Sequence, residues 1–329
     1  MRSLELLSVV APMHNEEESV DAFYERVRTA LQDVGPWQLV LVDDGSTDGT
    51  PALLDRLAET DPRVAVVHLS RSFGHQAALT AGLEHTHGNA IAMIDGDLQD
   101  PPELIADMVE RWREGADVVY AVRKQRAGET RMKLTTARWF YKLFARVAQV
   151  KLEQNSGDFR LLDRRALDAL LCMRERNRFL RGMTVWIGFT QTAIPYERDA
   201  RYAGETKFTP AKMLRFAFDA ITSFSWLPLQ AATFLGFFFS ALAFIGLPLV
   251  IIARFAGIYV PGVSSVLFVV LLLGGIQLIT VGLIGEYVGR IYDEVKGRPL
   301  YVVDSRRNVD VAEPPPAPAE QAPKQAAQT

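Results

Sequence analysis

Two aspartates near residue 95 directly follow a short apolar stretch, and their spacing suits them to hold a metal ion. The stretch at 90–94 (AIAMI) predicts a buried strand. Asp95 and Asp97 come next, and Gln99 adds an amide oxygen. Adjacent carboxylates repel each other unless a cation lies between them, and such oxygen donors bind Mg²⁺ or Mn²⁺ beside a polyphosphate. We therefore expect a metal site; the alternative is a solvated turn before a helix at Pro101.

Apolar runs that predict strands alternate with amphipathic runs that predict helices between residues 6 and 123. The expected strands begin near residues 6, 37, 64, 90 and 117. This alternation is typical of an α/β domain with a mostly parallel sheet, where ligands bind at the carboxyl ends of the strands. Polar residues that follow such ends are Glu16, Asp43, Asp44 and Arg123. We expect them to lie beside Asp95, although Asp-Gly-Ser at 44–46 could form only a helix-capping turn.

Composition excludes several classes of protein. The chain has 36 Lys and Arg against 39 Asp and Glu, a net charge of −3, so no nucleic-acid partner is expected. Cys172 is the only cysteine, which excludes a disulfide framework and a cysteine-rich metal site. A membrane protein fits better, as the distribution of charge shows.

No charged side chain lies between Asp219 and Arg254, or between Arg254 and Glu286. Each gap exceeds the roughly 20 apolar residues needed to cross a bilayer. We expect a two-helix transmembrane hairpin at 229–252 and 266–288, rather than two buried helices of a soluble domain. Basic residues flank its two outer ends, so the positive-inside rule places both termini and the N-terminal domain in the cytoplasm.

Seven segments of the chain resemble family 2 glycosyltransferases with a GT-A domain. In order, they are APMHNEEE, LVDDGSTDGT, SRSFGHQAALTAGL, DGDLQDPPE, NSGDFRLLDR, FLRGMTVWIGF and RYAGETKFT. With the hairpin they are most similar to polyprenyl-phosphate glycosyltransferases, the dolichol-phosphate mannosyltransferase and bactoprenol glucosyltransferase type, over residues 6–298. The resemblance implies a Rossmann-like GT-A fold, a nucleotide-sugar donor, a polyprenyl phosphate acceptor, and Mg²⁺ or Mn²⁺ as a Lewis acid.

The resemblance also implies roles for individual residues. Those implied to bind the nucleotide sugar are Pro12, His14, Glu16, Asp43, Asp44, Asp95, Gly96, Asp97, Arg123, Arg201 and Lys207. Asp44, alone or with Asp43, would accept from the base ring N–H, and His14 stands where the family often has tyrosine. The implied metal ligands are Asp95, Asp97 and Gln99. Asp158 and Asp97 are the expected catalytic carboxylates, unless Asp158 merely caps a helix at 163–171.

A lipid acceptor requires a surface that meets the membrane. Residues 131–150 predict a basic amphipathic helix of the interfacial type, with domain core as the alternative, and 210–228 read similarly. We expect Arg131 and Arg138 to meet the acceptor phosphate. The expected parts are a catalytic domain (1–209), an interfacial helix (210–228), the hairpin (229–290), a cytoplasmic extension (291–305) and a disordered tail (306–329).

The expected reaction is inverting transfer of one sugar to a polyprenyl phosphate on the cytoplasmic leaflet of a bacterial inner membrane, for a cell-envelope glycan or glycoconjugate. UDP-glucose is the first expected donor; GDP-mannose, UDP-N-acetylglucosamine and a UDP-aminoarabinose remain open. A processive polysaccharide synthase is disfavoured because TTARW at 135–139 lacks the Gln of the Gln-x-x-Arg-Trp motif. The other alternative is a non-catalytic membrane protein that binds nucleotide sugar. We expect a homo-oligomer, such as a tetramer, and a separate flippase downstream.

Overall fold

The computed structural model describes residues 1–124, 156–197 and 262–309, with scattered positions between 229 and 256. Several expectations lie outside these residues: the helices at 131–150 and 210–228, and most of the first predicted span. Four predicted site residues also lie outside them, namely Arg131, Arg138, Arg201 and Lys207.

One mixed sheet forms the centre of the N-terminal domain, with strand order β7-β5-β6-β4-β1-β2-β3-β8. The strands are β1 (Leu7–Met13), β2 (Trp37–Asp43), β3 (Val64–Leu69), β4 (Ala90–Met93), β5 (Val118–Arg123), β6 (Ser156–Asp163), β7 (Gln191–Tyr196) and β8 (Val303–Arg307). Strands β1, β2, β3 and β4 run parallel, as expected. β6 pairs antiparallel with both β4 and β5, so β5 shares the direction of the first four strands.

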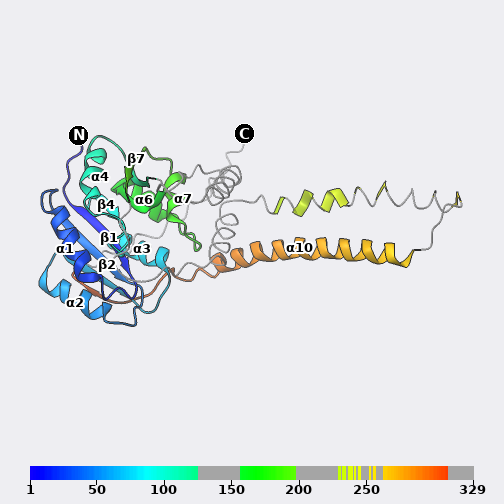
Figure 1. The fold of residues 1–329 in the computed structure, drawn as a ribbon, viewed down its shortest axis with the longest axis horizontal. Coiled ribbons are helices and arrows are strands. Elements are labelled where there is room, and N and C mark those ends of the chain that lie inside the picture. Colours follow the sequence, from blue (N-terminus) through cyan, green and yellow to red (C-terminus); the bar gives the residue numbers. More distant parts are fainter. Residues whose placement is uncertain are drawn as a thin grey trace, which may run out of the picture.

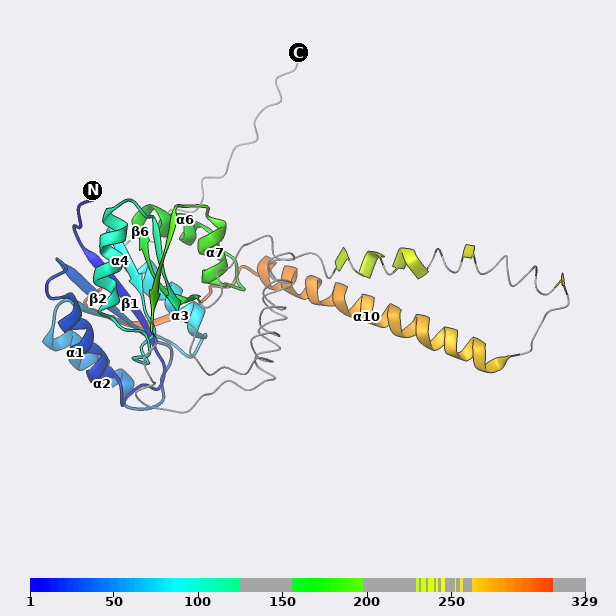
Figure 2. The same ribbon diagram turned by 45° about the horizontal axis from the view of Figure 1, so that its top comes forward.

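Helices cover both faces of this sheet (Figures 1 and 2). They are α1 (Val20–Leu31), α2 (Thr50–Thr60), α3 (His75–Glu84), α4 (Leu104–Arg113), α6 (Arg164–Cys172) and α7 (Leu180–Trp186). Because successive strand residues point to opposite faces, Val9 packs in one core with Phe23 and Trp112. Val10 packs in the other with Leu79 and Leu167. The alternation of strands and helices thus yields the sandwich that the sequence predicts.

Gly45 makes the turn after β2 possible. Its φ is +62°, and an added Cβ would lie 2.4 Å from backbone atoms of both Arg71 and Ser72. We expect Gly45→Ala to lower the free energy of unfolding by more than about 2 kcal/mol, because left-handed strain and overpacking add. Gly297→Ala is the matched control: its φ is +58°, close to that of Gly45, but nothing lies within 4 Å of an added Cβ. Thermal unfolding of both variants should show a clearly larger loss at position 45, and equal losses would contradict the steric explanation.

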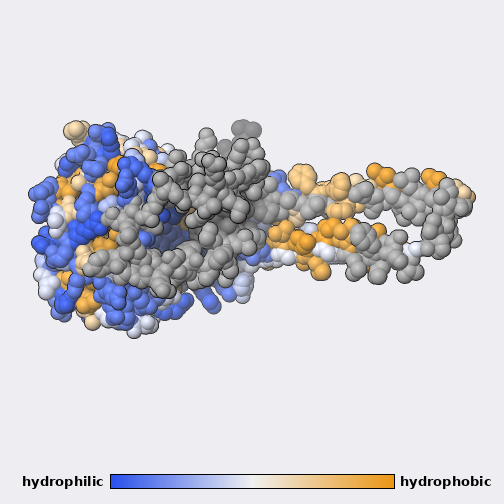
Figure 3. Space-filling model, in the orientation of Figure 1, coloured by the Kyte–Doolittle hydropathy of each residue, from blue (hydrophilic) through white to orange (hydrophobic). Residues whose placement is uncertain are grey.

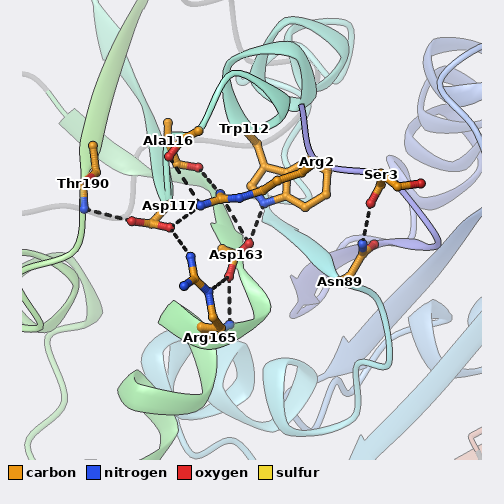
Figure 4. A network of polar contacts seen from close by, with 10 residues as sticks. Arg2, Ser3, Asn89, Trp112, Ala116, Asp117, Asp163, Arg165 and Thr190 are labelled. Carbon is orange, nitrogen blue, oxygen red and sulfur yellow. Dashed lines mark hydrogen bonds and ion pairs between the residues drawn. The ribbon is translucent and has the colours of Figure 1, made fainter.

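A polar network fastens the sheet at the edge opposite the predicted site (Figure 4). The Arg2 guanidinium lies 2.6 Å from Asp117 and 3.3 Å from Asp163. Asp163 also accepts a hydrogen bond from Trp112 Nε1 at 2.9 Å. Burial alone would raise the pKa of Asp163, but the hydrogen bonds from Trp112 and Arg165 hold it below its usual value. Asp163 is the N-cap of α6, so the alternative role of Asp158 as that helix cap is excluded.

The long helix α10 (Val263–Val295) leads away from the domain (Figure 1). Among the described residues, Leu272–Val295 is the one stretch of helix long and apolar enough to cross a membrane. Its described side chains form much of the apolar surface of the extension in Figure 3. The second predicted span, 266–288, therefore lies within α10. The pairing of two helices into a hairpin stays a prediction.

After α10 the chain returns to the sheet. A cavity of about 530 Å³ lies where the end of α10 meets the loop after α6, and there Arg176 N donates to Glu294 Oε1 at 2.7 Å. β8 then pairs antiparallel with β3. Because β8 runs to Arg307, the tail does not begin at 306; this correction moves ordered structure past the expected boundary. A five-residue strand rich in charge has no pattern that would predict it from the sequence.

Candidate active site

Carboxylates from two neighbouring strands meet at one edge of the sheet. Asp95 follows the carboxyl end of β4, and Asp158 stands near the start of antiparallel β6, where Met93 pairs with Arg160. Asp97 and Asp100 are close enough to Asp95 to repel its charge. We call these four side chains, Asp95, Asp97, Asp100 and Asp158, the acidic rim. Asp158 therefore joins Asp95 at the edge where the sequence predicts that acidic strand ends meet.

His75, the first residue of α3, lies between the two sides of the acidic rim. Its Nε2 is 3.5 Å from Asp95 Oδ1 and 3.6 Å from Asp158 Oδ2. Burial raises the pKa of Asp95 to about 6; the charge of His75 opposes the shift, and the charges of Asp158, Asp100 and Asp97 add to it. This crowding of negative charge is unfavourable without a counter-cation. The rim is therefore suited to a positively charged ligand.

Several side chains hold Asp158 in place. It accepts a hydrogen bond from Gln76 Nε2 at 3.1 Å, and Arg181 Nε lies 3.4 Å away. Burial alone would raise the pKa of Asp158, but the contact with His75 and the nearby cations Arg181 and Arg160 lower it well below its ordinary value. The carboxylate is thus ionised near neutral pH and fixed in direction.

Arg160 is a buried cation behind Asp158. Only 2% of Arg160 is exposed, and it donates to Thr184 Oγ1 and, at 2.8 Å, to the carbonyl oxygen of Gly157. Burial lowers its pKa to about 10, with Asp158 opposing the shift, so it remains charged at neutral pH. Loss of the Asp158 charge would leave this cation without its nearby carboxylate.

The turn between Asp95 and Gln99 packs tightly against β1. A Cβ on Gly96 would lie 2.4 Å from Met13 Sδ, so only glycine fits without movement. Asp97 Oδ1 accepts from the backbone N–H of Gln99 at 3.2 Å. Both side chains are half-buried. The spacing that suggests a metal site thus also forms a compact turn.

Asp43 and Asp44, both buried, hold loops in the structure. The Asp44 carboxylate accepts from Ser72 Oγ at 2.9 Å and from the backbone N–H of Phe73 at 2.7 Å. Asp43 accepts from Ser46 N at 2.9 Å, so a turn does form here. Contact of either carboxylate with a base ring stays a prediction.

Four further residues predicted to bind the nucleotide, all among the described ones, follow or end parallel strands at the same edge: Pro12, His14, Glu16 and Arg123. Pro12 is within β1, and His14 Nδ1 is 2.9 Å from the carbonyl oxygen of Asp44. Glu16 Oε2 accepts from Ser19 Oγ at 3.0 Å. Arg123 ends β5 and donates to Tyr196 OH at 3.0 Å. The edge therefore combines an acidic centre with flanking basic and aromatic groups.

Comparison with known proteins decides the family. The model for glycosyl transferase family 2 matches residues 8–171. A bactoprenol glucosyl transferase of Shigella phage SfX is 42% identical over 304 residues, which cover 92% of this chain and 99% of that protein. The chain belongs to glycosyl transferase family 2. It is a glycosyltransferase, and its sheet and helices are those of a GT-A domain.

Two further relatives of this family 2 glycosyltransferase match over a similar length. An uncharacterized glycosyltransferase, YkcC, of Bacillus subtilis (strain 168) is 44% identical over 305 residues, or 92% of this chain and 94% of that protein. A prophage bactoprenol glucosyl transferase homolog of Escherichia coli (strain K12) is 42% identical over 300 residues, or 90% and 98%. The resemblance drawn from the seven segments is therefore confirmed.

The oxygen ligands offered by Asp95, Asp97 and Gln99 fit a divalent cation that binds together with the nucleotide-sugar substrate. In the part of the chain that the structure describes, no three His, Cys, Asp or Glu side chains are grouped to hold a metal by themselves. Mg²⁺ is commonly bound by one or two carboxylates plus substrate phosphates. Asp95 and Asp97 would supply the carboxylates and Gln99 a further oxygen, so a cation should bind well only with a diphosphate.

Sequence reasoning did not single out His75, Gln76 or Arg181. All three lie within the segments that carry the family resemblance, SRSFGHQAALTAGL and FLRGMTVWIGF. Their contacts with Asp158 depend on α3 and α7 packing beside β6. Local sequence patterns carry no information on that packing.

Proposed function

We propose that this glycosyltransferase transfers glucose from UDP-glucose to a polyprenyl phosphate, with inversion, on the cytoplasmic leaflet of the bacterial inner membrane. The observation that carries the proposal is the match to bactoprenol glucosyl transferases over nearly their whole length, 99% for the protein of phage SfX and 97% for that of phage SfII. Because the match covers 92% of this chain, it includes the catalytic domain and extends into the apolar α10. A helix long and apolar enough to cross a membrane favours a lipid acceptor over a soluble one.

The acidic rim supports a division of roles. Asp95, Asp97 and Gln99 would hold Mg²⁺ or Mn²⁺, which when bound supplies a Lewis acid for the departing nucleoside diphosphate. Asp158 faces them from β6, held by Gln76 and Arg181. A phosphate acceptor is already anionic near neutral pH and needs no strong base. Asp158 therefore acts by orienting the sugar or the acceptor rather than by removing a proton.

Some of the residues to which we assign phosphate or membrane contacts lie outside the described ranges. Arg201 and Lys207 would contact the donor phosphates, and Arg131 and Arg138 the acceptor phosphate. The helices at 131–150 and 210–228 would rest on the bilayer, and two spans would place both termini in the cytoplasm. A homo-oligomer and a separate flippase complete the proposal.

A panel of donors tests the proposed reaction. The full-length protein in nanodiscs with undecaprenyl phosphate and Mg²⁺ or Mn²⁺ is given radiolabelled UDP-glucose, GDP-mannose, UDP-N-acetylglucosamine or UDP-aminoarabinose. We expect label in the lipid from UDP-glucose, with one sugar per lipid by mass spectrometry. Transfer from another donor would replace glucose but keep the acceptor. Chains of several sugars would favour a processive synthase, and no transfer from any donor would refute the proposal.

A further inference from the structure

His68, the last residue of β3 that pairs with β2, lies opposite Asp43 and has a carboxylate against each ring nitrogen. Nδ1 lies 3.0 Å from Asp43 Oδ2, and Nε2 lies 3.2 Å from Asp55 Oδ1. A neutral imidazole donates from only one nitrogen, so both contacts are hydrogen bonds only when the ring carries both protons. The hydrogen bond to Asp43 raises the pKa of His68; burial opposes the shift and Asp55 adds to it. The geometry thus describes a buried imidazolium between two carboxylates.

A cation from the far end of the chain completes this row of charges. Arg307 belongs to β8, which follows the membrane helix, and its Nε lies 3.2 Å from Asp55 Oδ1. Next to it, Asn308 Nδ2 donates to the carbonyl oxygens of Ala58 and Val64 and so fixes the end of β8 on the domain. Charges therefore alternate from Arg307 through Asp55 and His68 to Asp43.

Asp43, the last member of this row of charges, lies at the proposed nucleotide-binding edge of the sheet. The other carboxylate oxygen of Asp43 accepts from Ser46 N and shapes the turn after β2. The neighbouring residue, Asp44, holds the loop at Ser72 and Phe73. The direction of the Asp43 carboxylate, and with it the form of this turn, is supported by the hydrogen bond from His68 Nδ1, which is stronger when the ring is charged.

We infer that Arg307, Asp55 and His68 are positioning residues that hold Asp43 for binding of the nucleoside diphosphate. The segment after the membrane helix would then complete the nucleotide-binding edge of the catalytic domain. This inference rests on the proposed function, because it assumes that the edge formed by β1 and β2 binds a nucleotide. None of the three residues needs to touch the nucleotide itself.

The inference predicts a pH dependence. The charged groups that face His68 are Asp43 of β2 and Asp55 of α2, with Arg307 of β8 behind Asp55. Since the folded-state pKa of His68 is raised, its contribution is complete below the ordinary value of about 6.5 and is lost as the pH rises through the folded-state value. Affinity for UDP should therefore weaken on the alkaline side in the native protein.

Calorimetric titration of the full-length protein with UDP and Mg²⁺ tests the inference. His68→Asn cannot hold a charge and should weaken UDP binding about tenfold, the effect of losing a hydrogen bond between charged groups, and flatten the alkaline fall in affinity. Arg307→Gln, at a half-exposed position, should weaken binding about two- to fivefold. Arg306→Gln is the control: it removes the same charge from the same strand, where no contact with Asp55 exists among the described residues. Thermal midpoints show whether each variant folds.

The outcomes separate this inference from the proposed function. If His68→Asn and Arg307→Gln bind UDP like the native protein at every pH, while Asp97→Ala does not bind it, the positioning role is refuted and the proposed function stands. If Arg306→Gln weakens binding as much as Arg307→Gln, the specific row of charges is refuted. If Asp97→Ala also binds UDP normally, the proposed metal and diphosphate site is wrong. Imidazole ¹⁵N spectra with two protonated nitrogens at position 68 at pH 7 would support the inference, and a neutral ring would overturn it.

Discussion

Replacement of Asp97 by alanine should lower sugar transfer by about 10²–10³-fold, the range seen when one electrostatic group at a reacting centre is removed. Asp97 is a half-buried member of the acidic rim, and with Asp95 it provides the carboxylates proposed to hold the cation. Loss of one of two protein carboxylates should remove metal-dependent UDP binding as well. Radiolabel transfer and calorimetric UDP titration, each with and without Mg²⁺, measure the two effects.

Asp107→Ala is the matched control for this variant. Asp107 is an exposed acid in the first turn of α4 and lies outside the acidic rim. The Asp107→Ala substitution removes the same charge from the same domain. The rate of sugar transfer should stay within about twofold of that of the native protein, as for most surface changes. Full transfer by Asp97→Ala, or an equal loss in both variants, would show that Asp97 has no special role.

Replacement of Asp158 by asparagine should reduce both turnover and stability. The change keeps the shape but removes the charge that faces Arg181 and the buried Arg160. Breaking a buried ion pair on one side typically costs about 3–5 kcal/mol, and turnover should fall by about 10²-fold or more if Asp158 orients a substrate. Chemical unfolding and transfer kinetics, with kcat and KM separated, measure the two losses.

A second substitution separates the structural role of Asp158 from its chemical role. In Asp158→Asn combined with Arg181→Gln, one of the unpaired cations is also neutral, so part of the stability should return. Turnover should not return, because the carboxylate is still absent. Recovery of both quantities together would mean that Asp158 only stabilises the fold, and the catalytic assignment would then be withdrawn.

Secondary structure is predicted most reliably where a single local pattern of residues is enough to specify one strand or helix. Strands β1 to β5 follow from apolar runs that end in polar residues, and α10 follows from a long stretch without charge. The sequence does not predict β6, because Asp158 and Arg160 interrupt its apolar pattern; each of them contacts a side chain of a neighbouring element, Gln76 and Thr184 respectively. β8 was missed because an edge strand buries little and keeps charged residues, as Arg306 and Arg307 show.

The same limit applies to the site. Asp95 and Asp97 are recognisable because they are two residues apart and end a strand. The approach of Asp158 to Asp95 requires β6 to lie next to β4, and the position of His75 between them requires α3 to pack on that sheet. The row from Arg307 to Asp43 joins residues from opposite ends of the chain. Such contacts arise from packing, which no local pattern encodes.

Binding of Mn²⁺ to the full-length protein, followed by electron paramagnetic resonance with and without UDP, tests whether the cation and the diphosphate bind together at Asp95 and Asp97. Asp95, Asp97 and Gln99 offer two carboxylates and an amide oxygen, a set that is incomplete without phosphate oxygens. We predict weak Mn²⁺ binding alone, much tighter binding with UDP together with coupling to ³¹P, and loss of both in Asp97→Ala. Mn²⁺ that binds equally well without UDP, or that shows no coupling to phosphorus, would show that the cation and the diphosphate do not share this site.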